Sequence, residues 1–261
     1  MRVQWAYRSD TPLSTSYRDR GNNQLYISSK QEDPDEYDDS VLGHEIGHFL
    51  EHEFSHSDSP GGDHDGSPTD PRLAWSEGYG TFMGSAIFND SRYIDTKSTG
   101  SSEKDLSVTF DPLPVDNSCL YAFNNTCDDG YFGADFDGFC LYGADTADCG
   151  QRYTIPYADQ YLVKYSSGIN QNISENIVAS ILWNLANGSS LHTATDNKPI
   201  FDVLSNYFVL NNFNLYDVGV IGVDLADFIK GFQCVQHPEL TADLYTLVSL
   251  YHWPIDSIIC E

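Results

Sequence analysis

Residues 44–48 read His-Glu-Ile-Gly-His, an instance of the HExxH pattern and the strongest chemical signal in the chain. On a helix, positions i and i+4 share one face, so His44 and His48 can both reach one metal ion. Glu45 lies next to His44, where its carboxylate can take a proton from a water molecule on that metal. The spacing therefore predicts a zinc site with two histidine ligands and Glu45 as the general base.

The helix that carries this motif is predicted to run from about Pro34 to Phe54. Asp33 is a suitable N-cap, Pro34 suits the first helical position, and nearby acidic side chains favour the positive end of the helix dipole. Apolar residues recur at helical spacing and form the expected buried stripe: Leu42, Ile46, Phe49 and Leu50. Short β-strands are predicted before the helix, over 3–7 and 24–28, and the free edge of the second can pair with an extended peptide.

A second helix is expected to supply a third metal ligand, Glu77. Asp70 and Pro71 are typical of a helix start, and the helix should run from Arg72 to about Phe88. The residues that share the face of Glu77 are small: Ala74, Thr81, Gly84 and Ser85. Three glycines in this helix cost roughly 1 kcal/mol each relative to alanine, which close packing on the HExxH helix would explain. We therefore expect Glu77 to reach the metal beside the two histidines.

Other histidines fit a zinc site less well. The metzincin pattern HExxHxxGxxH is excluded, because Glu51 and Phe54 occupy its glycine and last histidine positions. Ligands at i, i+4 and i+8 would span about 12 Å along a helix, too far for His52 to share the ion. We expect the following histidines to lie in the cleft, beside a ligand or on the surface: His52, His56 and His64.

The composition limits the possible partners. The chain of 261 residues has 39 acidic against 13 basic residues, a formal net charge of -26. Such a chain repels phosphate backbones, so nucleic acid is not an expected partner. No apolar run approaches the ~20 residues of a membrane span, and the N-terminus has no apolar leader segment. If the protein is secreted, this chain is expected to be a processed form or a piece of a longer one.

Six cysteines indicate disulfides and an oxidising, extracytoplasmic compartment. Four of them fall in a segment rich in glycine and aspartate, 117–152: Cys119, Cys127, Cys140 and Cys149. Four cysteines allow three pairings, and the sequence leaves all three open. Six aspartates in this insert offer oxygen ligands, so it is either a calcium site or a solvated acidic loop: Asp128, Asp129, Asp135, Asp137, Asp145 and Asp148. Residues 89–116 before the insert are polar and predicted to be loop-like.

The C-terminal part, 153–261, is predicted to be mostly helical. Ser174 can cap a helix over 175–185 with an apolar stripe, which Asn187-Gly188 would end. Further helices are expected near 201–210, 225–232 and 240–251. Cys234 and Cys260 would then connect the last two of these helices.

The motif 44–48 with the downstream Ser76-Glu77-Gly78-Tyr79 resembles the gluzincin class of zinc metallopeptidases, which includes fungalysin-like and thermolysin-like enzymes. The resemblance implies His44, His48 and Glu77 as zinc ligands and Glu45 as general base. The helix near 177–183 resembles the one that follows in fungalysin-like enzymes. Bacterial secreted or surface proteins that share DEYDD, HExxH, SDSxGG and CDDG segments are also similar, so we expect a bacterial rather than a eukaryotic source.

This resemblance implies an α+β, zincin-like metalloprotease fold. The metal site would lie in an N-terminal subdomain, 1–116, which has a small β-sheet and the active-site helix. The disulfide-rich insert, 117–152, and a helical C-terminal subdomain, 153–261, would follow. Two features depart from the family pattern. Thr81 stands where thermolysin-like enzymes have an aspartate beside a histidine ligand. No histidine precedes the helix that Ser174 caps, where Asn170 or Asn172 stands instead, so the oxyanion-stabilising residue stays open among four candidates: Tyr153, Tyr157, Tyr161 and His192.

The expected function is zinc-dependent hydrolysis of peptide bonds by an endopeptidase, with a peptide or protein as substrate. Two alternatives remain open. The first is a secreted zincin-like surface or binding module with weak or absent proteolysis, which would bind calcium through the insert. The second is a zinc hydrolase of a non-peptide amide. We expect a monomer or part of a larger secreted chain.

Overall fold

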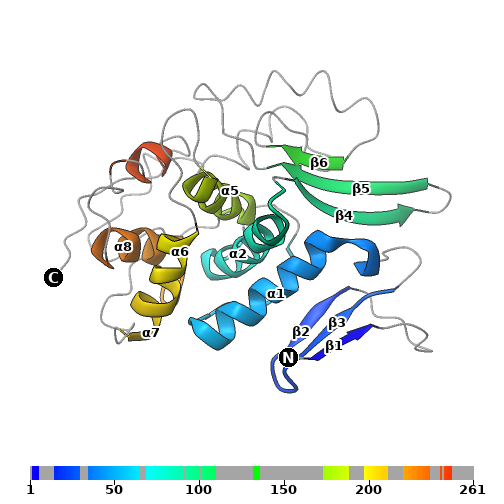
Figure 1. Cartoon of the computed structure of the whole chain (residues 1–261), viewed down its shortest axis with the longest axis horizontal. Helices are drawn as coiled ribbons and strands as arrows, with labels where there is room; N and C mark the ends of the chain where they lie inside the picture. Colours follow the sequence, from blue (N-terminus) through cyan, green and yellow to red (C-terminus); the bar gives the residue numbers. More distant parts are fainter. Residues whose placement is uncertain are drawn as a thin grey trace. The chain divides into compact units, whose positions relative to one another are not determined.

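The computed structural model describes residues 2–5, 15–29, 35–64, 69–90, 92–99, 102–109, 132–135, 173–187, 197–210, 220–235, 242 and 244–248. Figure 1 labels its helices and strands. The chain divides into two compact units, Met1–Phe49 with Gly80–Cys149 and Leu50–Tyr79 with Gly150–Glu261. The division is not sequential, unlike the three subdomains expected from the sequence. It crosses α1 (Asp39–Phe54) and α2 (Pro71–Phe88), each of which is one continuous helix.

A three-stranded sheet precedes α1 in the first unit, with the order β1-β3-β2. Strands β1 (Arg2–Trp5) and β3 (Gln24–Ile27) are parallel, and β2 (Tyr17–Asp19) is antiparallel to β3. The expectation that β3 has a free edge is therefore wrong, because β3 is the central strand of the sheet. The sequence indicated a polar connection where β2 lies, but Tyr17 pairs with Tyr26 and their rings stack at 4.9 Å between centroids.

Helix α1 begins later than expected, at Asp39 rather than Pro34. A 3-10 turn, η1 (Asp35–Tyr37), precedes it, and the Asp38 carbonyl accepts the first helical hydrogen bond from the Leu42 amide at 3.1 Å. The buried carboxylate of Asp35 in this turn accepts hydrogen bonds from the amide and hydroxyl of Ser16, which connect the turn to the residue before β2. The expected cap at 33–34 lies outside the described residues.

The segment predicted to be a loop, 89–116, contains a β-hairpin instead. Strands β4 (Arg92–Thr99) and β5 (Ser102–Thr109) pair antiparallel from Arg92↔Thr109 to Thr99↔Ser102, and β6 (Phe132–Asp135) adds in parallel to β5. The prediction was wrong because it relied on polarity, whereas the ladder is made by backbone groups. Serine and threonine with interspersed Tyr93, Leu106 and Val108 are compatible with strands.

In the second unit, α5 (Glu175–Asn187) confirms the predicted helix, and the Asn176 amide donates to the Ser174 hydroxyl at 3.1 Å as expected for a cap. The segment before α5 is paired with the one before α2, since Thr69 and Ile173 exchange both backbone hydrogen bonds, at 2.8 and 3.0 Å. Almost the whole of α5 is buried, so it is a central helix of this unit.

The remaining described helices of this unit are close to those predicted. Residues 198–210 form α6 (Lys198–Asp202), a π-helical turn η4 (Val203–Tyr207) and α7 (Phe208–Leu210). Helix α8 (Leu225–Val235) follows. Residues 244–248 are helical, within the last predicted helix. The aromatic core joins Trp75 of α2 to Phe228 of α8, with stacked rings 5.2 Å apart, and to Phe208 at 5.9 Å.

Cys234 is disulfide-bonded. The other five cysteines lie outside the described residues, so its pairing with Cys260 and the pairing within the insert stay predictions. No helix in the described ranges is long and apolar enough to cross a membrane.

Candidate metal centre

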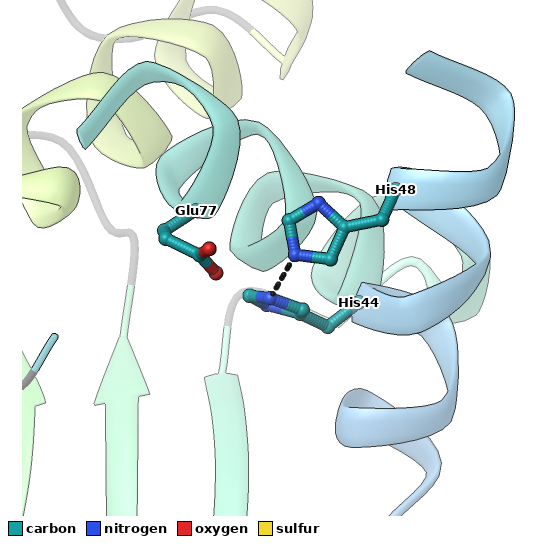
Figure 2. Close-up of side chains that lie close together, drawn as sticks. All are labelled: His44, His48 and Glu77. Atoms are coloured by element: carbon teal, nitrogen blue, oxygen red, sulfur yellow. Dashed lines mark hydrogen bonds between the residues drawn. The ribbon is translucent and has the colours of Figure 1, made fainter. Parts of the chain in front are cut away.

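The histidines of the HExxH motif lie one turn apart on α1, and their imidazole rings approach each other at the Nε2 atoms. Their Nε2 atoms are 3.0 Å apart and the ring centroids 4.6 Å, with the planes at 81° (Figure 2). Two nitrogens bound to a tetrahedral zinc at ~2.0–2.1 Å would be separated by roughly 3.3 Å. His44 and His48 therefore already have close to the spacing that one zinc ion requires.

Glycines let α1 and α2 approach closely at this point. A Cβ at Gly43 would lie 2.8 Å from the Cα of Gly84, and one at Gly47 would lie 3.1 Å from the Cα of Gly80. A Cβ at Gly80 would lie 2.8 Å from the Nε2 of His44. The glycine-rich face of α2 thus packs on the HExxH helix, as predicted from its small residues.

One glycine has a different partner. A Cβ at Gly78 would lie 2.4 Å from the Glu175 carbonyl oxygen and 2.5 Å from Val178 Cβ, both in α5. The expectation that all three glycines of α2 serve contact with α1 is wrong for Gly78. Within the first unit the close neighbour of α2 is α1, at Gly80 and Gly84, and within the second unit it is α5, at Gly78.

Helix α2 is defined at both ends by its sequence. Asp70 is its N-cap: its carbonyl accepts from the Ala74 amide at 2.8 Å, and its Oδ1 accepts from the Arg72 amide at 3.0 Å. At the other end Asn89 has φ of 52°, and the amides of Asn89 and Asp90 bond back to the last turn, as in a Schellman motif. The predicted helix of 72–88 is confirmed to within one residue.

Glu77 completes the group. One ligand atom each from His44, His48 and Glu77 lies within 4.8 Å of the others, and the Glu77 carboxylate points toward the two imidazoles (Figure 2). Glu77 is one turn before Gly80 and Thr81, which contact His44 directly, so the continuity of α2 sets its position. The structure brings together all three residues that the sequence predicted as ligands.

Thr81 contacts the other nitrogen of His44. Its Oγ1 lies 3.3 Å from His44 Nδ1, and its side chain is buried. A hydroxyl can accept from Nδ1–H, and in that tautomer Nε2 is the unprotonated nitrogen that can bind a metal. The sequence marked this position only as a departure from the thermolysin-like pattern, but the threonine lies against the same imidazole.

Burial strengthens the electrostatics of the site. His44 and Glu45 are each 6% exposed, and the Glu77 side chain is 12% exposed. Charges that are removed from water interact more strongly, because they are less screened. A divalent cation would therefore be held firmly by Glu77, and Glu45 would have few competing waters.

Other groups around the ligands were not identified from the sequence. Tyr93 of β4 lies against His44, with ring centroids 5.9 Å apart at 64°, in a segment that was predicted to be a loop. Glu51, fully buried in α1, accepts from the Ser76 hydroxyl at 2.7 Å, next to Glu77 in sequence. Burial, with a smaller contribution from the Glu51 carboxylate, raises the pKa of Tyr79, so its phenol stays protonated.

His64, which lies outside the motif, reaches a predicted ligand. Its Nε2 lies 3.3 Å from Oε2 of Glu77, and its Nδ1 lies 3.1 Å from Oε2 of Glu175. His56, in contrast, lies 3.1 Å from Asp58 with a side chain that is 48% exposed. His52 is half-buried in the last turns of α1. The sequence grouped these three histidines together, and tertiary contacts separate them.

Several predicted features lie outside the described residues. These include the four oxyanion candidates, 153, 157, 161 and 192, and the side chains of the six insert aspartates. A separate group of carboxylates does come together in the first unit, where oxygens of Asp35, Asp38 and Asp95 lie within 4.8 Å of one another. It is remote in sequence from the insert, so the calcium hypothesis for the insert stays a prediction.

Comparison with known proteins gives no relative: no family model, curated protein or solved structure matches this chain.

Proposed function

We propose that this chain is a zinc-dependent endopeptidase. The observation that supports the proposal most is the convergence of one ligand atom each from His44, His48 and Glu77 within 4.8 Å, with a buried glutamate, Glu45, adjoining the first of them in sequence. Two imidazoles and a carboxylate are the protein ligands of many hydrolytic zinc sites, which keep a fourth position for water or substrate. The zincin-like fold and the gluzincin resemblance are part of this proposal.

The donor set favours zinc over other common cations. Imidazole nitrogens suit zinc and neighbouring transition metals, whereas calcium and magnesium prefer an all-oxygen environment. The separation of the two Nε2 atoms, 3.0 Å, is close to the roughly 3.3 Å of a tetrahedral zinc site, but the donor types and not this distance carry the preference for zinc.

The residues have distinct roles in this proposal. His44, His48 and Glu77 hold the ion, and Thr81 orients the ring of His44 through Nδ1. Zinc, when bound, polarises the scissile carbonyl and lowers the pKa of its water to about 7. Glu45 accepts the proton of the attacking water and passes it to the leaving amine.

Paired substitutions test these roles separately. Glu45→Gln should retain one zinc per chain but lose hydrolysis of a peptide library by about 10²–10⁴-fold, the usual contribution of a general base. Glu77→Gln should lower zinc affinity, because a charged ligand is lost. Glu53→Gln is the matched control: it removes one charge from an exposed position on α1, the helix of Glu45, and should change neither zinc affinity nor hydrolysis.

Three results would contradict the proposal. Zinc stoichiometry near zero in the purified wild-type chain would refute the metal site, and full hydrolysis by Glu45→Gln would refute the role of Glu45. A fully zinc-loaded chain that cleaves no member of a broad peptide library would refute the peptidase and favour a binding module or an enzyme acting on another amide.

A further inference from the structure

We propose that His64 is a positioning residue for the metal ligand Glu77, and that Glu175 at the start of α5 holds His64 in place. This inference rests on the proposed zinc site. Two ion-pair distances carry it, with the imidazole of His64 protonated: His64 Nε2 lies 3.3 Å from Glu77 Oε2, and His64 Nδ1 lies 3.1 Å from Glu175 Oε2. The second contact is electrostatic, since Glu175 Oε2 has no hydrogen-bond partner among the described residues. One imidazole thus links a predicted ligand on α2 to a carboxylate on α5.

The burial of the two carboxylates makes this arrangement different from a surface ion pair. The side chains of Glu77 and Glu175 are 12% and 10% exposed, although His64 itself is 35% exposed. Exposed pairs contribute little, because water and salt screen them. A mostly buried carboxylate, in contrast, needs its polar contacts, and His64 supplies one of those of Glu77.

The segment that carries His64 is fixed to the rest of the second unit. Asp58 accepts from the Val223 amide at 3.0 Å, and a Cβ at Gly222, where φ is +108°, would lie 2.8 Å from Asp58 Cβ. These contacts fix the start of the segment, six residues before His64. The position of Glu175 is likewise fixed, because α5 begins at a capped, buried turn and Gly78 of α2 packs on it.

The physical consequence concerns the orientation of the Glu77 carboxylate. A carboxylate with one oxygen held by a neighbour presents the other in a fixed direction, and this lowers the entropy lost when a metal binds. Removal of such a partner typically weakens metal binding about 10–100-fold. His64 thereby connects the segment after α1 and the first turn of α5 to the zinc ligands.

Zinc affinity of the full chain, measured by competition with a chromogenic chelator, tests this role. His64→Ala should raise the dissociation constant about 10–100-fold. His64→Gln, whose amide can still donate to Glu77, should recover most of the affinity, which a merely structural role would not predict. Glu175→Ala should produce a smaller loss in the same direction. His56→Ala is the control: it removes a ring in the same segment that is 48% exposed and contacts Asp58 rather than a proposed ligand, it leaves the Asp58–Val223 hydrogen bond in place, and it should bind zinc as the wild type does.

Thermal unfolding of the metal-free variants and the visible spectrum of the cobalt-substituted protein complete the test. Unchanged zinc affinity in His64→Ala, or equal losses in His64→Ala and His64→Gln, would overturn the positioning role. Loss of the strong four-coordinate cobalt absorption in His64→Ala would overturn it in another way, since His64 would then be a ligand. Failure of the wild type to bind zinc would refute the proposed function itself, so the two failures are distinguishable.

Discussion

Replacement of Gly80 by alanine should weaken the metal site through one methyl group. A Cβ at this position would lie 2.8 Å from Nε2 of His44 and 2.9 Å from Cδ2 and Cε1. Ordinary contact begins near 3.4 Å, so the ring must move by roughly 0.6 Å. Metal–ligand distances tolerate only about 0.2 Å, so the displacement exceeds what the coordination geometry allows. We expect zinc affinity to fall at least about tenfold, equivalent to ~1.4 kcal/mol.

Stability should change much less than metal binding. Alanine gains about 1 kcal/mol over glycine in a helix interior. Overpacking costs about 1–3 kcal/mol, so the two effects largely offset each other in the metal-free protein. A small change in the free energy of unfolding with a large loss of zinc affinity is therefore the expected signature of Gly80→Ala.

The control is Gly84→Ala, one turn further along α2. Its Cβ would lie 2.5 Å from the Ser40 carbonyl oxygen, a backbone atom that cannot move aside easily, and 3.0 Å from the Tyr93 ring. This variant should lose more stability and less zinc affinity than Gly80→Ala. Chelator competition and chemical denaturation measure both quantities. Wild-type zinc affinity in Gly80→Ala would refute the reasoning, because the His44 ring would then yield without consequence.

Two further predictions address the supports of the site. Thr81→Val removes the hydroxyl at His44 Nδ1 and should lower zinc affinity about tenfold, whereas Thr81→Ser should restore it, as chelator competition would reveal. The hydrogen bond from Arg72, together with its charge, lowers the pKa of Asp70 in the folded protein. The ionised N-cap therefore stabilises the fold fully above the ordinary carboxyl pKa near ~4, and this stabilisation is lost as the pH falls below that value. Asp70→Ala should therefore lower the free energy of unfolding by about 1 kcal/mol at pH 7. In denaturation curves, the difference from the wild type should shrink below about pH 4. A difference that does not change with pH would contradict this linkage.

The local structure of the two ligand-bearing helices could be read from the sequence. Spacing i, i+4 places His44 and His48 on one face whatever lies around them. Asp70 begins α2 through its own backbone and side-chain bonds, and small residues predicted the close approach of α1. These features depend on interactions within a few residues, which sequence periodicity and capping preferences record directly.

Only the tertiary structure decided which groups surround the ligands. Thr81 had no assigned role until its hydroxyl was found at His44, and His64 could not be told from His56 by residue type. The β4–β5 hairpin was missed because polar side chains do not reveal backbone pairing, and Gly78 was assigned to the wrong neighbour because a small residue does not specify what packs on it.

The physical reason is the range of the interactions. The sequence by itself determined the two helices and, through their periodicity, the likeness of HExxH and Glu77 to a zinc site. Contacts between segments far apart in the chain, such as those of His64 with Glu77 and Glu175, depend on how the elements pack, and no local pattern encodes them. Tertiary structure thus determined which groups contact the proposed ligands and how far these side chains are buried.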